Sequence, residues 1–207
     1  MRSSAVFRAA AAGTLAFALG AASLLWLVSS VGPAASATLS AGDVLGADSL
    51  YQLESPWQTD DGRSLRLHQL RGRFQVLALI FTRCPGVCPT LVRELQSLEK
   101  ALPAAAQGRT GFVLVTIDPE HDTPEVLREY RKKMGLAPER WTLLRGEPDD
   151  LRELAATLGF NYEPSGPSGF AHSRLITVLE PGGRIVHQQA DLAEDPGKVV
   201  SAIHERL

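Results

Sequence analysis

Short apolar runs alternate along the chain with segments whose apolar residues recur at helical spacing. Continuous apolar runs at residues 75–81, 112–117 and 141–144 predict strands that are covered on both faces. Leucine spacing after Pro89, a Thr-Pro start at Thr123 and a glycine stop after Leu158 predict helices between and beyond these strands. The helices are expected from residue 89, from residue 123 and over residues 149–158.

The flanking segments predict two β-hairpins and a last helix. Asp60-Asp61-Gly62 is a turn signal between residues 51–53 and 64–67, inside an otherwise irregular stretch over residues 38–74. A Gly-, Pro- and Ser-rich loop is expected over residues 161–171. Strands at 175–179 and 184–187 flank a Pro-Gly-Gly turn, and residues 196–207 predict a helix. This order indicates an α/β fold with a central mixed sheet flanked by helices, with a β-hairpin.

The N-terminal segment has the pattern of an export signal. Arg2 and Arg8 precede an apolar run over residues 9–28, and Ala35-Ser36-Ala37 fits a small-residue cleavage site. The run is also long enough to span a bilayer as a helix, so residues 1–37 are either a signal peptide or an N-terminal membrane anchor. In both cases the positive charges place the body outside the cytoplasm, on the periplasmic side of the inner membrane, anchored or released.

Length and composition fit one further domain. The chain has 207 residues with 44% hydrophobic and 21% charged residues, which argues against disorder and against a polytopic membrane protein. A linker over residues 38–47 and a folded domain over residues 48–207 are expected. The formal net charge of −2 offers no electrostatic attraction for nucleic acid. Two cysteines are too few for a disulfide scaffold.

Those two cysteines carry the strongest chemical signal. Cys84 and Cys88 follow the first buried strand at C-x3-C spacing, where a helix N-terminus favours thiolates, and Asp118 follows the second. Carboxyl ends of parallel strands gather ligand chemistry at one sheet edge. Three interpretations remain open for the pair: a structural disulfide, a redox-active dithiol, and a site for a soft metal ion such as cuprous copper or zinc.

A metal site needs a third ligand, and the histidines supply candidates. His172 stands at the end of the predicted loop, which could carry it to the sulfurs, although a histidine satisfied within its loop is the alternative. His121 is the rival at the same edge, with a solvated helix start as its alternative. The other three histidines are predicted at the surface or at an edge: His68, His187 and His204. Met134 is predicted in the core rather than in a site.

Three motifs, in order and at matching separations over residues 48–206, resemble the Sco/SenC proteins, which are thioredoxin-like copper proteins of respiratory membranes. The motifs are Cys84-Pro85-x-Val87-Cys88-Pro89, Asp118-Pro119-x-x-Asp122-Thr123-Pro124, and His172-Ser173 before an apolar strand and a Pro-Gly-Gly turn. The resemblance implies a thioredoxin-like domain in which Cys84, Cys88 and His172 bind one copper ion. It further implies Asp118 as support for the site or as a partner contact, and Asp122 as helix-start structure.

The resemblance also implies a role in oxidase assembly. That role is delivery of copper to the dinuclear site of cytochrome c oxidase subunit II, or to another copper protein, or reduction of that site's cysteines. A metallochaperone is favoured over an enzyme. The alternative is an exported thiol–disulfide oxidoreductase that uses the C-x3-C pair, with a thiol–disulfide reductant as partner and a possible Cys84–Cys88 disulfide. Gly86 departs from the acidic or polar residue that many relatives carry between the cysteines, which leaves the target open.

Overall fold

A mixed β-sheet forms the centre of the part of the chain that the computed structural model describes, residues 46–166, 169–190 and 195–207. The sheet has seven strands in the order β2-β1-β5-β4-β3-β8-β9, and β3, β4 and β5 are parallel to one another. A separate two-stranded antiparallel sheet is formed by β6 and β7. The strands are β1 (Pro56–Thr59), β2 (Ser64–Arg66), β3 (Phe74–Ile80), β4 (Thr110–Thr116), β5 (Trp141–Arg145), β6 (Tyr162–Pro164), β7 (Phe170–His172), β8 (Ile176–Leu179) and β9 (Ile185–Gln189).

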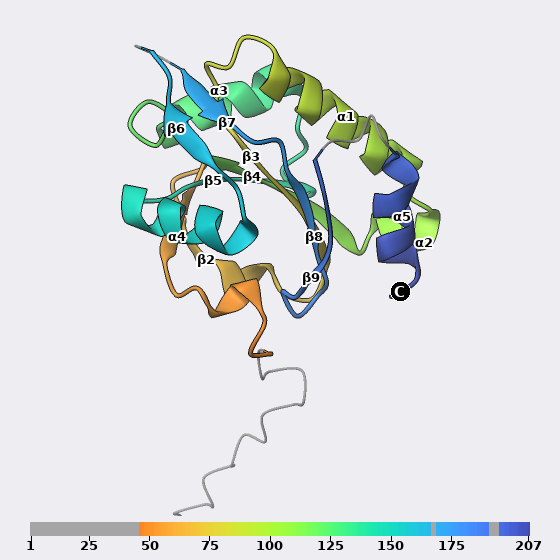
Figure 1. Cartoon of the computed structure of the whole chain (residues 1–207). Helices are drawn as coiled ribbons and strands as arrows, with labels where there is room; N and C mark the ends of the chain where they lie inside the picture. Colours follow the sequence, from red (N-terminus) through yellow and green to blue (C-terminus); the bar gives the residue numbers. More distant parts are fainter. Residues whose placement is uncertain (1–45, 167–168, 191–194) are drawn as a thin grey trace, which may run out of the picture. The chain divides into compact units, whose positions relative to one another are not determined.

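Helices flank the central sheet, as predicted. The helices are α1 (Val87–Ala101), α2 (Ala104–Gln107), α3 (Pro124–Met134), α4 (Pro148–Leu158) and α5 (Pro196–His204), with 3₁₀ turns η1 (Leu50–Gln52) and η2 (Leu67–Leu70). Figure 1 shows α1 and α3 together on one side of the sheet and α4 on the other. Within the described ranges, each helix is too short or too polar to cross a membrane.

The long elements confirm the sequence predictions closely. Helix α3 is the clearest case, because the Thr123 hydroxyl accepts a hydrogen bond from the Val126 N–H, Pro124 occupies the first turn, and Gly135 ends the helix at φ +67°. These three signals are local, so the sequence alone is sufficient to predict where this helix begins and ends.

Two short segments differ from the prediction. The N-terminal hairpin has the predicted turn, but its first strand is β1 rather than residues 51–53, because Tyr51 is fully buried within the η1 turn. The prediction of an irregular loop over residues 161–171 is wrong, since β6 and β7 pair there as an antiparallel hairpin. Helix α2 was not predicted.

The predicted signal or anchor over residues 1–37 lies outside the described residues. The linker predicted over residues 38–47 lies almost entirely outside them too. These boundaries therefore stay predictions.

The parallel pair β3 and β4 forms the buried centre of the sheet. Every residue of both strands is buried, which explains their continuous apolar sequence. Gln75 is the polar exception in β3, and its side-chain amide donates to the Leu70 carbonyl at 2.8 Å. Their register runs from Phe74 opposite Thr110 to Ile80 opposite Thr116, so both strands end at the same edge.

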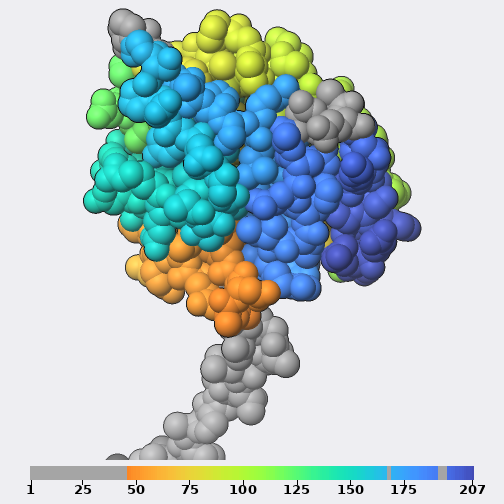
Figure 2. Space-filling view, in the orientation of Figure 1, coloured from red at the N-terminus to blue at the C-terminus, as the bar shows by residue number. Residues whose placement is uncertain are grey.

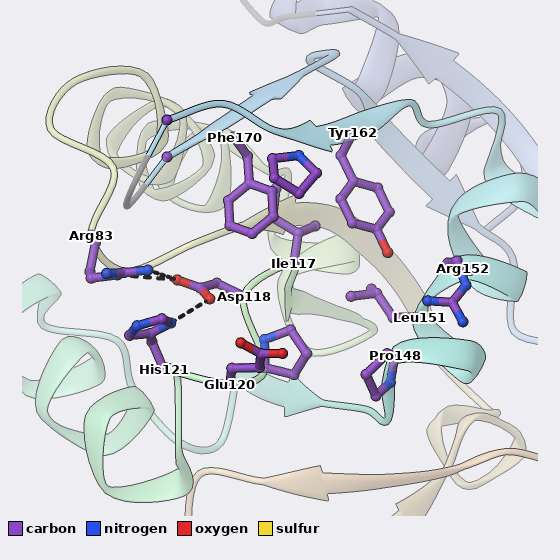
Figure 3. Close-up of a pocket in the computed structure, with 14 residues that line it drawn as sticks. Arg83, Ile117, Asp118, Glu120, His121, Pro148, Leu151, Arg152, Tyr162 and Phe170 are labelled. Atoms are coloured by element: carbon purple, nitrogen blue, oxygen red, sulfur yellow. Dashed lines mark hydrogen bonds and ion pairs between the residues drawn. The ribbon is translucent and has the colours of Figure 1, made fainter.

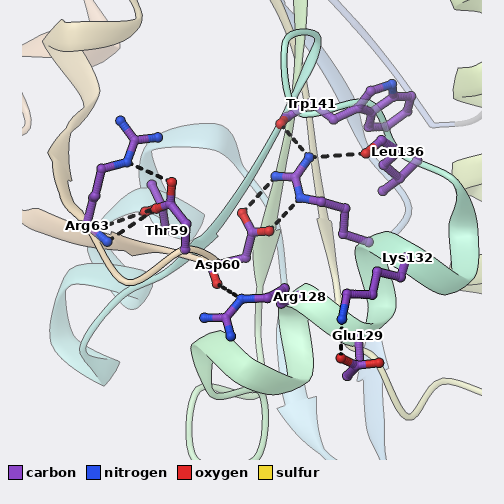
Figure 4. Close-up of polar contacts among 10 residues, drawn as sticks. Thr59, Asp60, Arg63, Arg128, Glu129, Lys132, Leu136 and Trp141 are labelled. Carbon is purple, nitrogen blue, oxygen red and sulfur yellow. Dashed lines mark hydrogen bonds and ion pairs between the residues drawn. The ribbon is translucent and has the colours of Figure 1, made fainter.

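A buried ion pair joins the β1–β2 turn to α3. The Arg131 guanidinium donates to both carboxylate oxygens of Asp60, at 2.5 and 2.7 Å, and to the carbonyls of Leu136 and Trp141. Figure 4 shows these contacts where the turn, α3 and the start of β5 meet. The side chains of Asp60 and Arg131 are only 8% and 13% exposed, so little water screens the pair.

Replacing Arg131 with alanine should destabilise the protein by about 3–5 kcal/mol, because the Asp60 carboxylate would remain buried without its cation. Chemical denaturation followed by circular dichroism measures this change. The control is Arg63→Ala, which removes the exposed Arg63–Asp61 pair and should cost less than about 1 kcal/mol. Equal losses in the two variants would contradict the structural role of the buried pair.

Candidate metal centre

The two cysteines lie on the turn that joins β3 to α1. The chain leaves β3 after Ile80, turns with the Cys84 N–H donating to the Phe81 carbonyl at 3.3 Å, and enters α1 at Val87. Cys88 therefore lies in the first turn of the helix, whereas Cys84 precedes it. Both thiols are free, and Cys84 is 8% exposed while Cys88 is 1% exposed. The chain is non-helical from Cys84 to Gly86, and α1 begins at Val87.

His172 completes a compact cluster with both cysteines. The two sulfur atoms and one ring nitrogen of His172 all lie within 4.8 Å of one another. The structure thus brings together the three residues that the sequence predicted as ligands, although His172 is more than eighty positions from either cysteine. Two sulfurs and one imidazole nitrogen form a soft donor set that suits cuprous copper or zinc.

The ring of His172 is held with one nitrogen available. Its Nδ1 lies 2.8 Å from the Ser173 carbonyl, which can only accept, so Nδ1 carries the proton and Nε2 keeps a free lone pair. His172 lies in β7, opposite Tyr162 of β6, rather than at the end of a loop as the sequence predicted. The backbone that carries the imidazole is therefore fixed by strand pairing.

Aromatic side chains fix this hairpin over the end of β3. The His172 ring packs edge-on against Phe81, with 5.8 Å between the ring centroids, and stacks on Phe160, with 6.0 Å between the centroids. The Phe81 ring also packs against Phe170, at a centroid distance of 5.4 Å. Figure 2 shows the hairpin on the surface between α4 and α1. The predicted site omitted these rings, although the alternation of Phe160 with Tyr162 and of Phe170 with His172 was a strand signal in the sequence.

The two thiols have different acidities. Burial would raise the pKa of the Cys84 thiol, but hydrogen bonds from the backbone N–H groups of Cys88, Gly86 and Val87 outweigh it and hold the pKa below its ordinary value. The Cys88 N–H, for example, donates to the Cys84 sulfur at 3.3 Å. Burial raises the pKa of the Cys88 thiol to about 12. Cys84 is thus the more acidic and the less deeply buried of the two thiols.

Asp118 belongs to a neighbouring group rather than to the cluster. Its carboxylate accepts from Arg83 at 2.7 Å and contacts His121 Nδ1 at 2.9 Å (Figure 3). Arg83 directly precedes Cys84, so Asp118 supports the cysteine turn through its contact with Arg83. This agrees with the supporting role that was predicted for Asp118. His121 is half exposed and engaged with Asp118, and it does not join the cluster.

A pocket of about 460 Å³ adjoins this group, between the end of β4, the start of α4 and the hairpin. Ile117 and Leu151 supply apolar walls, Tyr162 and Phe170 supply aromatic ones, and Arg83 lines the pocket beside the cysteine turn (Figure 3). The space next to the Asp118 group therefore combines apolar and charged surface.

Asp122 does not have the predicted helix-start role. Thr123 is the N-cap of α3, whereas Asp122 is fully buried and accepts hydrogen bonds from Thr82 and Thr116. No local sequence pattern marks Thr82, because its contact with Asp122 spans forty positions.

The remaining candidates lie away from the cluster. His187 is on β9, an edge strand, where its Nε2 contacts Gln189 at 2.7 Å, and His68 and His204 lie in η2 and α5. Met134 packs against the core, as predicted.

Gly86 lies between the cysteines without steric need for glycine. A methyl group at its Cα would meet no atom within 4 Å, and its φ is −143°. Larger side chains are therefore compatible with this turn.

Comparison with known proteins places the described residues in a family. A model of the SCO1/SenC family matches residues 48–207. A protein of Stutzerimonas stutzeri that is named for copper binding is 32% identical over 138 residues, which cover 65% of each chain. The SCO1 homologue of Bacillus subtilis (strain 168) is 25% identical over 150 residues, which cover 70% of this chain and 77% of that protein.

The fold also matches solved structures. The copper-bound crystal structure of ScoI from Arabidopsis thaliana superposes with a TM-score of 0.64 at 24% identity, covering 73% of this chain and 96% of that one. The predicted thioredoxin-like α/β fold, with its central mixed sheet, is thereby confirmed.

Iodoacetamide should alkylate Cys84 at least about tenfold faster than Cys88 in the reduced protein at neutral pH, because only the thiolate reacts and Cys88 is buried. The Cys84 rate should level off as pH rises past its lowered pKa, whereas Cys88 should react appreciably only in alkali. Mass spectrometry of the peptides measures both rates. Equal rates at neutral pH would show that the two thiols are not distinguished in this way.

Proposed function

The chain belongs to the SCO1/SenC family, and on that premise we propose that it is a copper metallochaperone that serves the dinuclear copper site of cytochrome c oxidase during assembly. The observation that carries the proposal is the convergence of the Cys84 and Cys88 sulfurs and a His172 nitrogen within 4.8 Å. Copper is the cargo, and the copper-bound relative from Arabidopsis supports this choice over zinc.

Capture begins at Cys84, which is the more exposed of the two thiols and the more acidic. Its thiolate binds the incoming cuprous ion, and Cys88 then loses its proton as the ion displaces it and shields the second sulfur charge. The Nε2 lone pair of His172 completes a three-coordinate site, while Nδ1 stays bonded to the Ser173 carbonyl. The rings of Phe81 and Phe160 pack against the imidazole and hold its orientation.

Release proceeds by exchange of ligands with a partner. Two partner thiolates replace the sulfurs of Cys84 and Cys88 one at a time, so the ion is never free in solution. The pocket beside Arg83 offers room for the partner's neighbouring residues. Subunit II of cytochrome c oxidase is the partner proposed, with another copper protein as the alternative.

Export is part of the same proposal. Arg2, Arg8 and the apolar segment that follows support a location on the periplasmic side of the inner membrane. Carbonate extraction of membranes from cells that produce the tagged full chain distinguishes an anchored form from a released one.

His172→Ala should lower the affinity of the reduced protein for cuprous copper by more than about 100-fold, since loss of an outer partner of a metal ligand alone costs 10–100-fold. Anaerobic competition with a chromogenic copper(I) chelator measures the affinity. His121→Ala is the control and should bind copper as the unaltered protein does, because His121 contacts Asp118 outside the cluster. Unchanged affinity in His172→Ala would remove this residue from the site.

The unequal thiols favour a second candidate function, an exported thiol–disulfide reductase. The Cys84 thiolate would attack a partner disulfide, form a mixed disulfide and release one partner thiol. Cys88 would then displace the second thiol, so that the partner gains two electrons and two protons and this chain becomes the Cys84–Cys88 disulfide.

Under this second function, Cys88→Ser should trap a covalent complex with an oxidised subunit II domain, because the resolving thiol is absent. Cys84→Ser should trap none. Non-reducing electrophoresis detects the complex. If neither variant forms a complex while the unaltered protein still transfers copper, the reductase candidate fails and the metallochaperone stands.

A further inference from the structure

Asp122 is a buried carboxylate that neither the copper site nor helix capping uses. Its side chain is fully buried, directly before the N-cap Thr123 of α3. It accepts three hydrogen bonds: from the Thr82 N–H at 3.0 Å, from the Thr82 hydroxyl at 2.5 Å, and from the Thr116 hydroxyl at 2.5 Å. All three donors are neutral. Burial of a carboxylate costs free energy, and here neutral hydrogen-bond donors offset that cost without a cation. A buried charge of this kind points to a specific role for Asp122.

The role is indicated by where the donors lie. Thr82 is two residues before Cys84, on the turn that leaves β3, and both its backbone and its side chain are bound by the one carboxylate. Thr116 is the last residue of β4, next to Ile80 in the register of the sheet. Asp122 therefore ties the start of the cysteine turn to the end of the neighbouring strand.

A second carboxylate extends the same anchor. The Thr116 hydroxyl accepts from the Asp118 N–H at 3.0 Å, and the Asp118 side chain accepts from the guanidinium of Arg83 at 2.7 and 3.1 Å (Figure 3). The Asp122 N–H in turn donates to the Asp118 carbonyl at 2.8 Å. The two residues that precede Cys84 are thus both held by residues 116–122 through a connected network.

We propose that Asp122 is a positioning residue for the dithiol, which fixes the turn from Thr82 so that the Cys84 and Cys88 sulfurs are held ready for one ion before that ion arrives. This role rests on the proposed function, since copper is the ion that the dithiol then receives. Ligands that are held in place before binding lose less freedom on binding, and affinity rises accordingly.

Asp122→Asn is the first test. An amide presents one acceptor atom instead of two, and its NH₂ group cannot accept from a threonine hydroxyl, so at least one of the three donors loses its partner. Copper(I) affinity of the reduced full-length protein, measured by chelator competition, should fall by about tenfold or more. Asp60→Asn is the matched control, because it alters an equally buried carboxylate in the β1–β2 turn. It should lower stability yet leave the copper affinity of the folded protein within about twofold.

A metal-free probe separates positioning from copper binding. Phenylarsine oxide bridges two thiols: two As–S bonds form, and its oxygen leaves as water with the two thiol protons. Its affinity depends on how the sulfurs are held relative to each other and does not need His172. This affinity should also fall by about tenfold in Asp122→Asn and stay unchanged in Asp60→Asn.

Two milder variants keep the test decisive if Asp122→Asn fails to fold. Thr82→Val removes one hydroxyl and keeps the backbone hydrogen bond, so both affinities should fall by a smaller factor, and Thr82→Ser should restore them. Unaltered affinities in Asp122→Asn and Thr82→Val, or equal losses in Asp60→Asn, would overturn the positioning role. Arsenical binding that depends on Asp122 in a protein that binds no copper would support positioning while refuting the proposed function.

Discussion

The parallel register of β3 and β4 is the constraint on which the rest of the site depends. Ile80 lies opposite Thr116, and the Ile117 N–H donates to the Ile80 carbonyl at 2.8 Å, so both chains leave the sheet side by side. The residues after β3 carry the thiols, and those after β4 carry the carboxylates that bind the thiol-bearing turn. Every residue in both strands is buried, so a shift of this register would disrupt the packing on both faces of the sheet and separate the two turns.

The third donor reaches the site by a different route. His172 belongs to a small hairpin outside the main sheet. Aromatic packing on Phe81 joins that hairpin to the start of the cysteine turn, and Phe160, just before β6, stacks on the imidazole. The sulfurs are held by strand pairing and buried hydrogen bonds, whereas the imidazole is held by ring contacts and one carbonyl. The two parts of the cluster are therefore stabilised by separate sets of interactions.

Much of this arrangement could be predicted from local sequence signals. The apolar runs of β3 and β4 and the cap residues of α3 act within a few positions, and the order of elements then places Cys84, Cys88 and Asp118 at one edge. The hairpin was missed because β6 and β7 have three residues each and lie within a segment rich in Gly, Pro and Ser. The role of Asp122 was missed because its partner Thr82 is forty residues away, and no local pattern encodes such a contact. His172 was selected from its place at the end of the predicted loop and then from its motif, and only the folded chain explains how its ring is oriented.

The open surroundings of Gly86 separate the placement of the donor atoms from the charge of the surface beside them. The donor atoms are held by buried neighbours, whereas a Cβ at residue 86, between the two cysteines, would meet no atom within 4 Å. A substitution there would change the charge beside the sulfurs without a steric demand on the turn that holds them.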